Sequence, residues 1–209
     1  IPTYIFMSVI VALFLGLMVS AEEIIRDQKI RKREAFLNLS KGSYILSKVL
    51  IMFTISAIQM LLFVMVGNSI LGIKGMWLDY WLALFSVTCF ANLLGLNISA
   101  SFNSAVTIYI LIPFLIIPQL LLSGIVVKFD KLNPTITSQT EVPFVGQMMA
   151  SRWAFEALTV DQFKDNKFES KFYIYDKYKS VDNLRKNEWL TAMRNALNEC
   201  ENDYKNPQM

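Results

Sequence analysis

Residues 80–127 read YWLALFSVTCFANLLGLNISASFNSAVTIYILIPFLIIPQLLLSGIVV, 48 consecutive residues without an Asp, Glu, Lys or Arg. As one straight helix at about 1.5 Å per residue, this stretch would measure roughly 72 Å. The hydrocarbon core of a bilayer is only about 30 Å thick. The stretch therefore predicts two membrane-spanning helices. The turn between them is predicted at 97–104, NISASFNS, which is rich in Asn and Ser.

Two further uncharged stretches, 1–21 and 49–73, each have about the 20 residues that one crossing needs. The second span is predicted to begin at Ser43, after a break at Gly42. The first stretch is not expected to be a signal peptide, because no basic residue precedes it, acidic Glu22 and Glu23 follow it, and it is too long. A chain that opens Ile-Pro-Thr is expected to be a piece of a longer polypeptide. The predicted fold class is all-α, a polytopic membrane helix bundle with about four spans.

Small and polar residues inside these spans have an ordinary structural explanation. Gly16 and Ser20 permit close contact between helices, although a helix that merely faces lipid is the simpler interpretation. Gln59 and Asn68 carry amides that usually bond to a neighbouring helix when they lie in hydrocarbon. Helix packing therefore accounts for them without a functional site.

The distribution of charge predicts which side each loop faces. Segment 22–48 carries seven basic and four acidic residues, whereas the loop between the second and third spans carries only Lys74 and Asp79. By the positive-inside rule, residues 22–42 are cytoplasmic. The second loop and residues 128–209 are then external to a plasma or inner membrane.

Two interfacial features fit this topology. Trp77, Tyr80 and Trp81 form a cluster typical of the aromatic belt, which marks the outer interface. Residues 22–41 predict an imperfectly amphipathic helix, for which an anchor at the lipid headgroups is the simplest interpretation. Its i,i+4 spacing predicts the ion pairs Glu22 with Arg26 and Asp27 with Arg31.

The second half of the chain is less regular. Pro113 and Pro118 predict that the fourth span is broken or lines a cavity, and kinks tolerated by packing are equally consistent with them. Within 128–163, an external loop is followed by an apolar segment, 144–163, that contains charges and is short. That segment predicts a re-entrant or interfacial element and not a crossing.

The tail, residues 164–209, predicts a small external helical region. Ser180 could cap a helix there, because apolar residues follow at spacings of three and four. This pattern predicts a small packed element with one apolar face. The residues on that face are Leu190, Met193, Leu197, Cys200 and Tyr204.

The composition excludes several classes of function. The chain has no His and no glycine-rich phosphate loop, so it offers neither the commonest general base nor a P-loop for ATP. A net charge of +3 is too small to indicate nucleic acid. Cys89 and Cys200 have no zinc-ligand spacing. Between Val49 and Val127 the only charges are Lys74 and Asp79, which favours apolar or amphipathic cargo.

The order of these elements resembles the transmembrane domain of ABC exporters of the G subfamily, within the type-2 exporter group. The resemblance runs from the first span to about Phe163. RDQKIRKREAFLNLSKGSYILSK, from Arg26, is similar to the family's cytoplasmic segment that forms a coupling helix on the ATPase domain. LLLSGIVV, from Leu120, is similar to the outer end of the family's transport path, and SRWAFEALTVDQF, from Ser151, resembles its re-entrant segment.

The resemblance implies a role for each of these segments. The implied coupling residues are Arg26, Lys29, Arg33, Glu34 and Phe36. The implied translocation path and outer constriction comprise Pro113, Pro118, Ser123, Gly124, Ile125 and Val126. The implied re-entrant residues are Trp153, Phe155 and Glu156.

The resemblance also implies what lies outside this sequence. Residues 1–127 would be spans two to five of six, and the last span would follow Met209. ATP and Mg would bind a nucleotide-binding domain of the same polypeptide, and no cofactor would bind this chain. A second copy or a half-transporter partner would complete the transporter. The charged tail is longer than in eukaryotic members, which favours a bacterial source.

The predicted function is the permease domain of an ATP-driven exporter for an apolar or amphipathic substrate. The alternative is a mechanotransmission or structural membrane subunit that acts on an external partner without conducting anything, with the charged tail as the docking surface. A membrane-embedded enzyme would need catalytic residues from other segments.

Overall fold

The structure is a computed structural model that describes residues 2–33, 40–102, 104–123, 144–164, 166 and 169–205. This part of the chain contains helices and no strand, so the predicted all-α class is confirmed. The chain divides into two compact units, Ile1–Asp161 and Gln162–Met209. The helices that begin in the first unit are α1 (Pro2–Ala21), α2 (Glu23–Arg33), α3 (Lys41–Leu71), α4 (Trp77–Ser101), α5 (Ala105–Leu121), α6 (Phe144–Gln147) and α7 (Ala150–Lys164).

Three helical stretches in the described residues are long and apolar enough to cross a membrane: Pro2–Ile30, α3 and α4. With 31 residues, α3 is about 46 Å long and extends beyond a hydrocarbon core of about 30 Å. The fourth apolar helix, α5, has 17 residues and measures about 25 Å. It runs through Pro113 and Pro118 as one helix, so the prolines do not break it.

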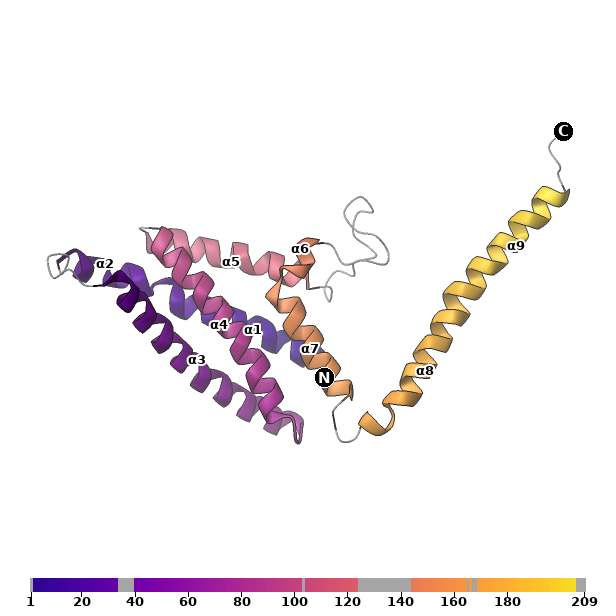
Figure 1. Ribbon diagram of the computed structural model, residues 1–209, viewed down its shortest axis with the longest axis horizontal. Helices are drawn as coiled ribbons and strands as arrows, with labels where there is room; N and C mark the ends of the chain where they lie inside the picture. The colour runs from indigo at the N-terminus through magenta and orange to yellow at the C-terminus, as the bar shows by residue number, and fades with distance from the viewer. Residues whose placement is uncertain are drawn as a thin grey trace. The chain divides into compact units, whose positions relative to one another are not determined.

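The core of the first unit is built around α4, which packs along α1 and α3 (Figure 1). The helices α1 and α4 approach closely at Gly16, where an added Cβ would lie 2.7 Å from the Ala91 Cβ and 2.9 Å from the Thr88 carbonyl oxygen. Gly95 of α4 lies in the same way against Ser20 of α1. We call these five residues the small-residue seam. Small residues spaced by four on both helices allow the backbones to approach, so α1 does not simply face lipid.

Buried polar side chains bridge the same three helices. The Asn92 side-chain amide of α4 donates to the Ser56 hydroxyl of α3 at 2.7 Å. The Tyr4 hydroxyl of α1 donates to the Asn68 side-chain oxygen of α3 at 3.3 Å. The prediction that Asn68 serves helix packing is therefore confirmed.

The turns lie close to the predicted positions, with two differences. The helix α4 continues through Ser101 before the chain turns, so most of the predicted turn at 97–104 is still helical. Gly42 lies in the first turn of α3 and does not break the chain before it, so that prediction is wrong. The far end of α3 stops at Gly72, whose φ of 68° is a left-handed conformation that favours glycine.

The predicted aromatic belt is only partly a surface feature. Trp77 is 40% exposed. Tyr80 is fully buried and stacks on Tyr4 with a centroid separation of 6.3 Å. Trp81 donates its indole N–H to the Ala57 carbonyl oxygen of α3 at 3.0 Å. Two of the three aromatic side chains thus join the α3–α4 hairpin and α1 together.

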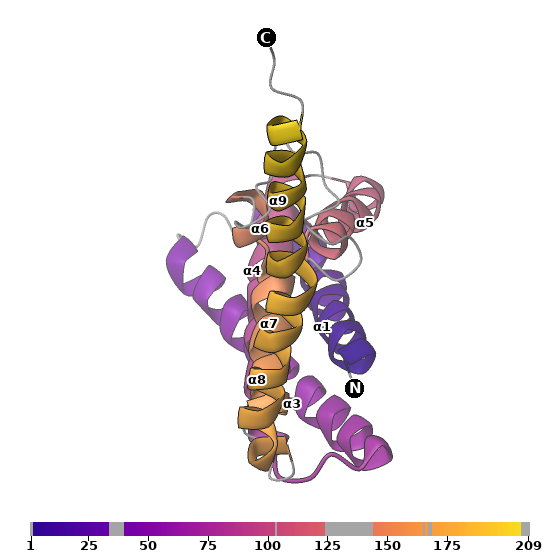
Figure 2. The ribbon, with the colours of Figure 1, turned by 90° about the vertical axis from the view of Figure 1, so that its right-hand side faces the viewer.

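The second unit is a helical run. After a 3₁₀ turn at Glu169–Lys171, α8 (Tyr173–Leu184) leads through a π-helical turn (Arg185–Trp189) into α9 (Leu190–Lys205), as Figure 2 shows. Ser180 lies inside α8, so the predicted cap is wrong. Every described side chain from Ser170 to Tyr204 is exposed within the unit, so the predicted packed element is not packed here. We call residues 173–205 the tail helix.

Candidate coupling site

The short helix α2 is held at its N-terminus by a side chain from α4. The first backbone N–H groups of a helix have no partner inside the helix. The Ser99 hydroxyl of α4 accepts two of them, from Ile24 at 3.0 Å and from Ile25 at 3.2 Å. Ser99 therefore caps α2 from a different helix, in the way that a serine at the N-cap would do locally.

A cluster of charged side chains fixes α2 to α3. The Lys48 Nζ of α3 lies 2.7 Å from Glu23 Oε1 and 2.6 Å from Asp27 Oδ2. The Tyr44 hydroxyl, one turn before Lys48, donates to the same Asp27 oxygen at 3.1 Å. We call Glu23, Asp27, Tyr44 and Lys48 the Lys48 cluster. Because one ammonium group bridges two carboxylates on successive turns of α2, the cluster resists sliding of α2 along α3.

The electrostatics of the cluster favour its ionised form. The hydrogen bond from Lys48 holds the pKa of Asp27 below its ordinary value, against the opposing effect of burial. The side chains of Glu23, Asp27 and Lys48 are 9%, 20% and 14% exposed, so their charges are largely shielded from water. A charge cluster of this kind is costly to break because removal of one partner leaves the others buried and unpaired.

A second face of α2 is basic and exposed. Arg26, Lys29 and Arg33 are exposed and lie within about 60° of each other on the helix, and Ile30, which is 53% exposed, lies about 40° from Arg26. Arg26 also pairs with Glu23 at 2.7 Å, and not with Glu22 as the spacing predicted. Asp27 pairs with Lys48, and the side chain of Arg31, its predicted partner, lies outside the described residues.

Not all predicted coupling residues can be placed. The structure brings Arg26, Lys29 and Arg33 together on one exposed face, whereas Glu34 and Phe36 lie outside the described residues. Tyr44 and Lys48 lie in the stretch that resembles the family's cytoplasmic segment, but their contacts with α2, and those of Ser99, were not predicted. The three residues lie 17 to 75 residues from their partners on α2, so no local spacing could have revealed these contacts. The available signal for Lys48 was its position one residue before the uncharged stretch that begins at Val49.

The predicted translocation path is described in part. Ile108, Ile112 and Ile116 of α5 are buried at intervals of four residues, on the face that meets α1. Pro113 is exposed on another face, and Pro118 is half-buried. Ser123 follows the helix, buried, and donates to the Leu120 carbonyl oxygen at 2.7 Å. Gly124, Ile125 and Val126 lie outside the described residues, so the outer constriction stays a prediction.

The predicted re-entrant segment consists of α6 and α7. With 15 residues, α7 measures about 22 Å and is too short to cross a hydrocarbon core. Trp153 donates its indole N–H to the Gln147 carbonyl oxygen at 2.7 Å, which ties α7 to α6. Phe155 contacts the Phe6 ring of α1 edge to face, and Glu156 pairs with Arg152 at 3.1 Å.

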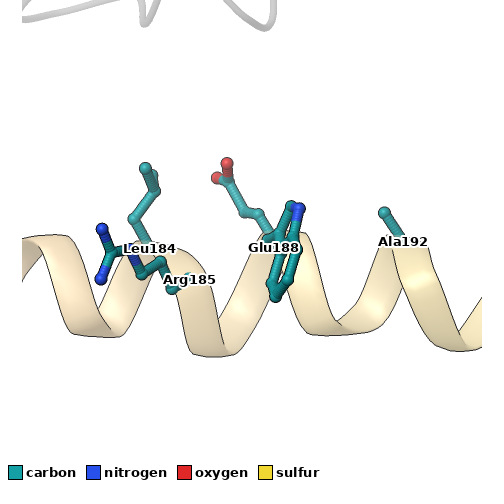
Figure 3. Close-up of a pocket in the computed structure, with 5 residues that line it drawn as sticks. Leu184, Arg185, Glu188 and Ala192 are labelled. Atoms are coloured by element: carbon teal, nitrogen blue, oxygen red, sulfur yellow. The ribbon is translucent and has the colours of Figure 1, made fainter.

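Other kinds of site find no support in the part of the chain that the structure describes. No group of three His, Cys, Asp or Glu side chains there could hold a metal ion. A hollow on the second unit is bounded by Leu184, Arg185, Glu188, Trp189 and Ala192 (Figure 3). All five belong to one continuous helical run, and a surface formed by a single helix cannot enclose a small molecule.

The comparisons with known proteins agree with this architecture. Residues 1–163 match the membrane family of the ABC-2 type transporter. No curated protein and no solved structure matches the chain. The match covers all of the apolar helices, the α2 segment and nearly all of α7. The chain therefore belongs to the ABC-2 type transporter membrane family: it is a multi-pass membrane protein and the permease component of an ABC transporter.

Proposed function

We propose that this permease belongs to an exporter of the G-subfamily type and that α2 is its coupling helix. The observation that carries the proposal is the two-sidedness of α2. Its exposed face presents Arg26, Lys29 and Arg33, and its other face is fixed to α3 by Lys48 and to α4 by Ser99. Force applied to the basic face would therefore reach two membrane helices through short polar contacts.

The proposed partner for the basic face is an ATP-binding domain, in the same polypeptide, on the cytoplasmic side. Closure of two such domains on ATP would move α2, and the transporter, as a homodimer or with a half-transporter partner, would alternate between two states of access. Residues 22–42 would face the cytoplasm and 128–209 the exterior of a plasma membrane. Modification of Lys29 by a membrane-impermeant reagent in intact cells would contradict this sidedness.

An apolar or amphipathic substrate is proposed from the surfaces of the spans. Most of the exposed side chains of α3 and α5 are apolar, for example Ile70, Ile110 and Phe114, each more than 70% exposed. Between Val49 and Val127 the only charges are Lys74 and Asp79, at one end of the spans. A small hydrated ion would find no compensating charge along such a route.

The test is charge reversal on the exposed face of α2 in the complete transporter. Arg33→Glu should abolish ATP-driven movement of a fluorescent amphipathic probe into inverted vesicles while ATP hydrolysis continues. Lys74→Glu, a reversal of the same size in the loop at the other end of α3, is the matched control and should transport normally. Normal transport by Arg33→Glu, at normal protein levels, would contradict the proposed coupling role.

A second variant tests the connection inside the membrane domain. Lys48→Met should leave Glu23 and Asp27 without their shared partner and destabilise the α2–α3 contact by about 2–4 kcal/mol. We expect transport to fall with ATP hydrolysis retained. If transport by Lys48→Met were normal, force would have to reach the spans by another route.

One observation favours the alternative of a mechanotransmission subunit. The tail helix is exposed along its whole described length and has an apolar face, as a docking surface would have. Reconstituted vesicles separate the two functions. Nucleotide-dependent probe movement that survives substitution of the tail's apolar residues supports the exporter. The alternative is supported if the probe does not move and the vesicles retain an external protein only when the tail's apolar residues are intact.

A further inference from the structure

The tail helix has an apolar stripe with Arg185 near its centre, and the π-helical turn aligns the two halves of the stripe. At about 100° per residue, Ile174, Tyr178 and Val181 of α8 and the apolar residues Met193, Leu197, Cys200 and Tyr204 of α9 would point about 100° apart if the two helices were joined without interruption. The Leu190 N–H bonds to the Arg185 carbonyl oxygen across five residues, which marks an inserted residue. The insertion turns α9 back by about 90° and brings the two sets into line.

The side chains in Figure 3 display this realignment. Leu184 and Ala192 are eight residues apart, and in an uninterrupted α-helix they would differ by about 80° in direction. In Figure 3 they rise from the same side of the helix, together with Glu188. We call the aligned residues the tail stripe: Ile174, Tyr178, Val181, Trp189, Met193, Leu197, Cys200 and Tyr204. Each is exposed within its unit.

The spacing of the tail stripe is that of a helix which packs against another helix. Met193, Leu197, Cys200 and Tyr204 are separated by four, three and four residues, and Ile174, Tyr178 and Val181 by four and three. These are the intervals of the a and d positions of a coiled coil. A partner for the stripe must therefore offer a long helix with matching apolar positions.

We propose that the tail helix pairs with the tail helix of a second copy of this chain, antiparallel and centred on Trp189. In that register the residues facing each other have numbers that add to 378. Every stripe residue then meets an apolar or aliphatic position: Ile174 with Tyr204, Tyr178 with Cys200, Val181 with Leu197, Trp189 with its own copy, and Met193 with the aliphatic stem of Arg185. The contact is two-fold symmetric, as expected for identical chains.

The charges that flank the stripe support this register. In an antiparallel pair, the e positions of the two helices lie beside each other, as do the g positions. Asp182 and Arg194 are both at e positions and meet across the pair, twice by symmetry. At the g positions, Leu184 meets Ala196. A parallel pair in register would instead place each stripe position beside its own copy, so that Arg185, four residues after Val181, would face Arg185, and Asp182 would lie near Lys177 at a g position and not near Arg194.

The same charges argue against a lipid surface as the occupant. A helix that lies on a membrane has a polar face rich in Lys and Arg. The tail helix carries six basic and six acidic residues, so its polar side has no net attraction for anionic headgroups. The mixed charges suit a protein partner with the complementary order, which a reversed copy of the same helix provides.

The first test is a cysteine cross-link in membranes that contain the full chain, with the native Cys89 replaced by Ser. Tyr178→Cys places a thiol opposite Cys200 of the second copy, and oxidation should give a disulfide-linked dimer. Within one chain the two positions are about 33 Å apart, so no internal disulfide can form. Lys179→Cys, one residue away on the opposite side of the helix, is the control and should give no dimer.

The wild-type Cys200 background distinguishes the competing arrangements. A dimer through Cys200 alone would show a parallel pair and overturn the proposal. No dimer from Tyr178→Cys, together with protection of Cys200 from a water-soluble maleimide, would assign the stripe to lipid or another protein and would equally overturn it.

The second test is a charge exchange in the Tyr178→Cys background. Asp182→Arg and Arg194→Asp should each abolish the cross-link, because each places like charges together at two sites. The double variant Asp182→Arg with Arg194→Asp should restore it. Recovery of the cross-link could not be explained if the single substitutions had merely unfolded the helix. Failure of the double variant to recover the dimer would overturn the register.

Discussion

The α1–α4 pair and the tail helix present their packing faces in opposite ways. On α1, buried Leu13 and exposed Phe14 are both apolar, so polarity does not distinguish the face that packs from the face that does not. The distinguishing property is size, at Gly16 against Ala91. On the tail helix polarity marks the face. The difference follows from the surroundings: between helices in lipid, close fit replaces the hydrophobic effect that selects a face in water.

Among the substitutions that compare these two regions, the largest effect is expected at the small-residue seam. Gly16→Ala adds a Cβ that would lie 2.7 Å from the Ala91 Cβ and 2.9 Å from a backbone oxygen, so one helix must shift. We expect the free energy of unfolding in mixed micelles to fall by about 1–3 kcal/mol.

Gly42→Ala is the matched control for that substitution. Gly42 lies in a helix as well, but an added Cβ there has its nearest contact at 3.9 Å. Alanine should stabilise this position by about 0.5–1 kcal/mol because it restricts the unfolded chain. If Gly16→Ala and Gly42→Ala changed the free energy of unfolding in the same direction, the seam would tolerate a larger side chain. The comparison with the tail helix would then not hold.

The same difference explains how far the sequence predicts the fold. Uncharged stretches predict the spans, and the Asn and Ser residues predict the turn to within a few residues. The partners of Gly16 and of Lys48 are not predicted, because an apolar helix has no preferred face in its pattern. Ser180 was a poor guide because a serine caps only where the preceding chain is not already helical.

The candidate site also has features that the sequence reveals and features that only the folded chain reveals. The basic face of α2 is visible in the sequence because its charges follow one another within a few residues. The features that make it a possible coupling element, Ser99 and Lys48, belong to helices that only the folded chain brings to α2. The tail stripe is the reverse case: its spacing is visible in the sequence, but the π-helical turn that aligns its two halves is not.

The Lys48 cluster adds a third kind of contact, by charge, and its strength depends on pH. Because the pKa of Asp27 is lowered in the folded protein, its contribution to stability is present above about pH 4 and is lost as the pH falls further. Thermal unfolding between pH 6 and pH 3 should show a steep loss in the wild type. Asp27→Asn should melt lower at pH 6 and depend less on pH. If the melting temperatures of the wild type and of Asp27→Asn changed in parallel with pH, the ionised pairing of Asp27 with Lys48 would be contradicted.

A smaller effect is expected where a hydrogen bond joins two spans. Ser56→Ala removes the nearer of the two acceptors of the Asn92 amide, the other being the Met52 carbonyl oxygen at 3.5 Å, and should cost about 0.6 kcal/mol, and at most about 1.7 kcal/mol. Thr54→Val, two residues away, removes a hydroxyl that bonds only to its own helix at Leu50 and should change little. Equal effects of the two substitutions would indicate that the Asn92 contact adds nothing to the fit between α3 and α4.

The smallest effect is expected for an increase in size on the tail helix. Ala192 is exposed and lies beside the tail stripe, not in it. Ala192→Leu should therefore leave the free energy of unfolding unchanged to within about 0.5 kcal/mol and preserve the helix content seen by circular dichroism. This is the same direction of change that breaks the seam at Gly16. Destabilisation by Ala192→Leu as large as that by Gly16→Ala would mean that this side of the tail helix is also closely packed. Close fit would then select the packing face in both regions.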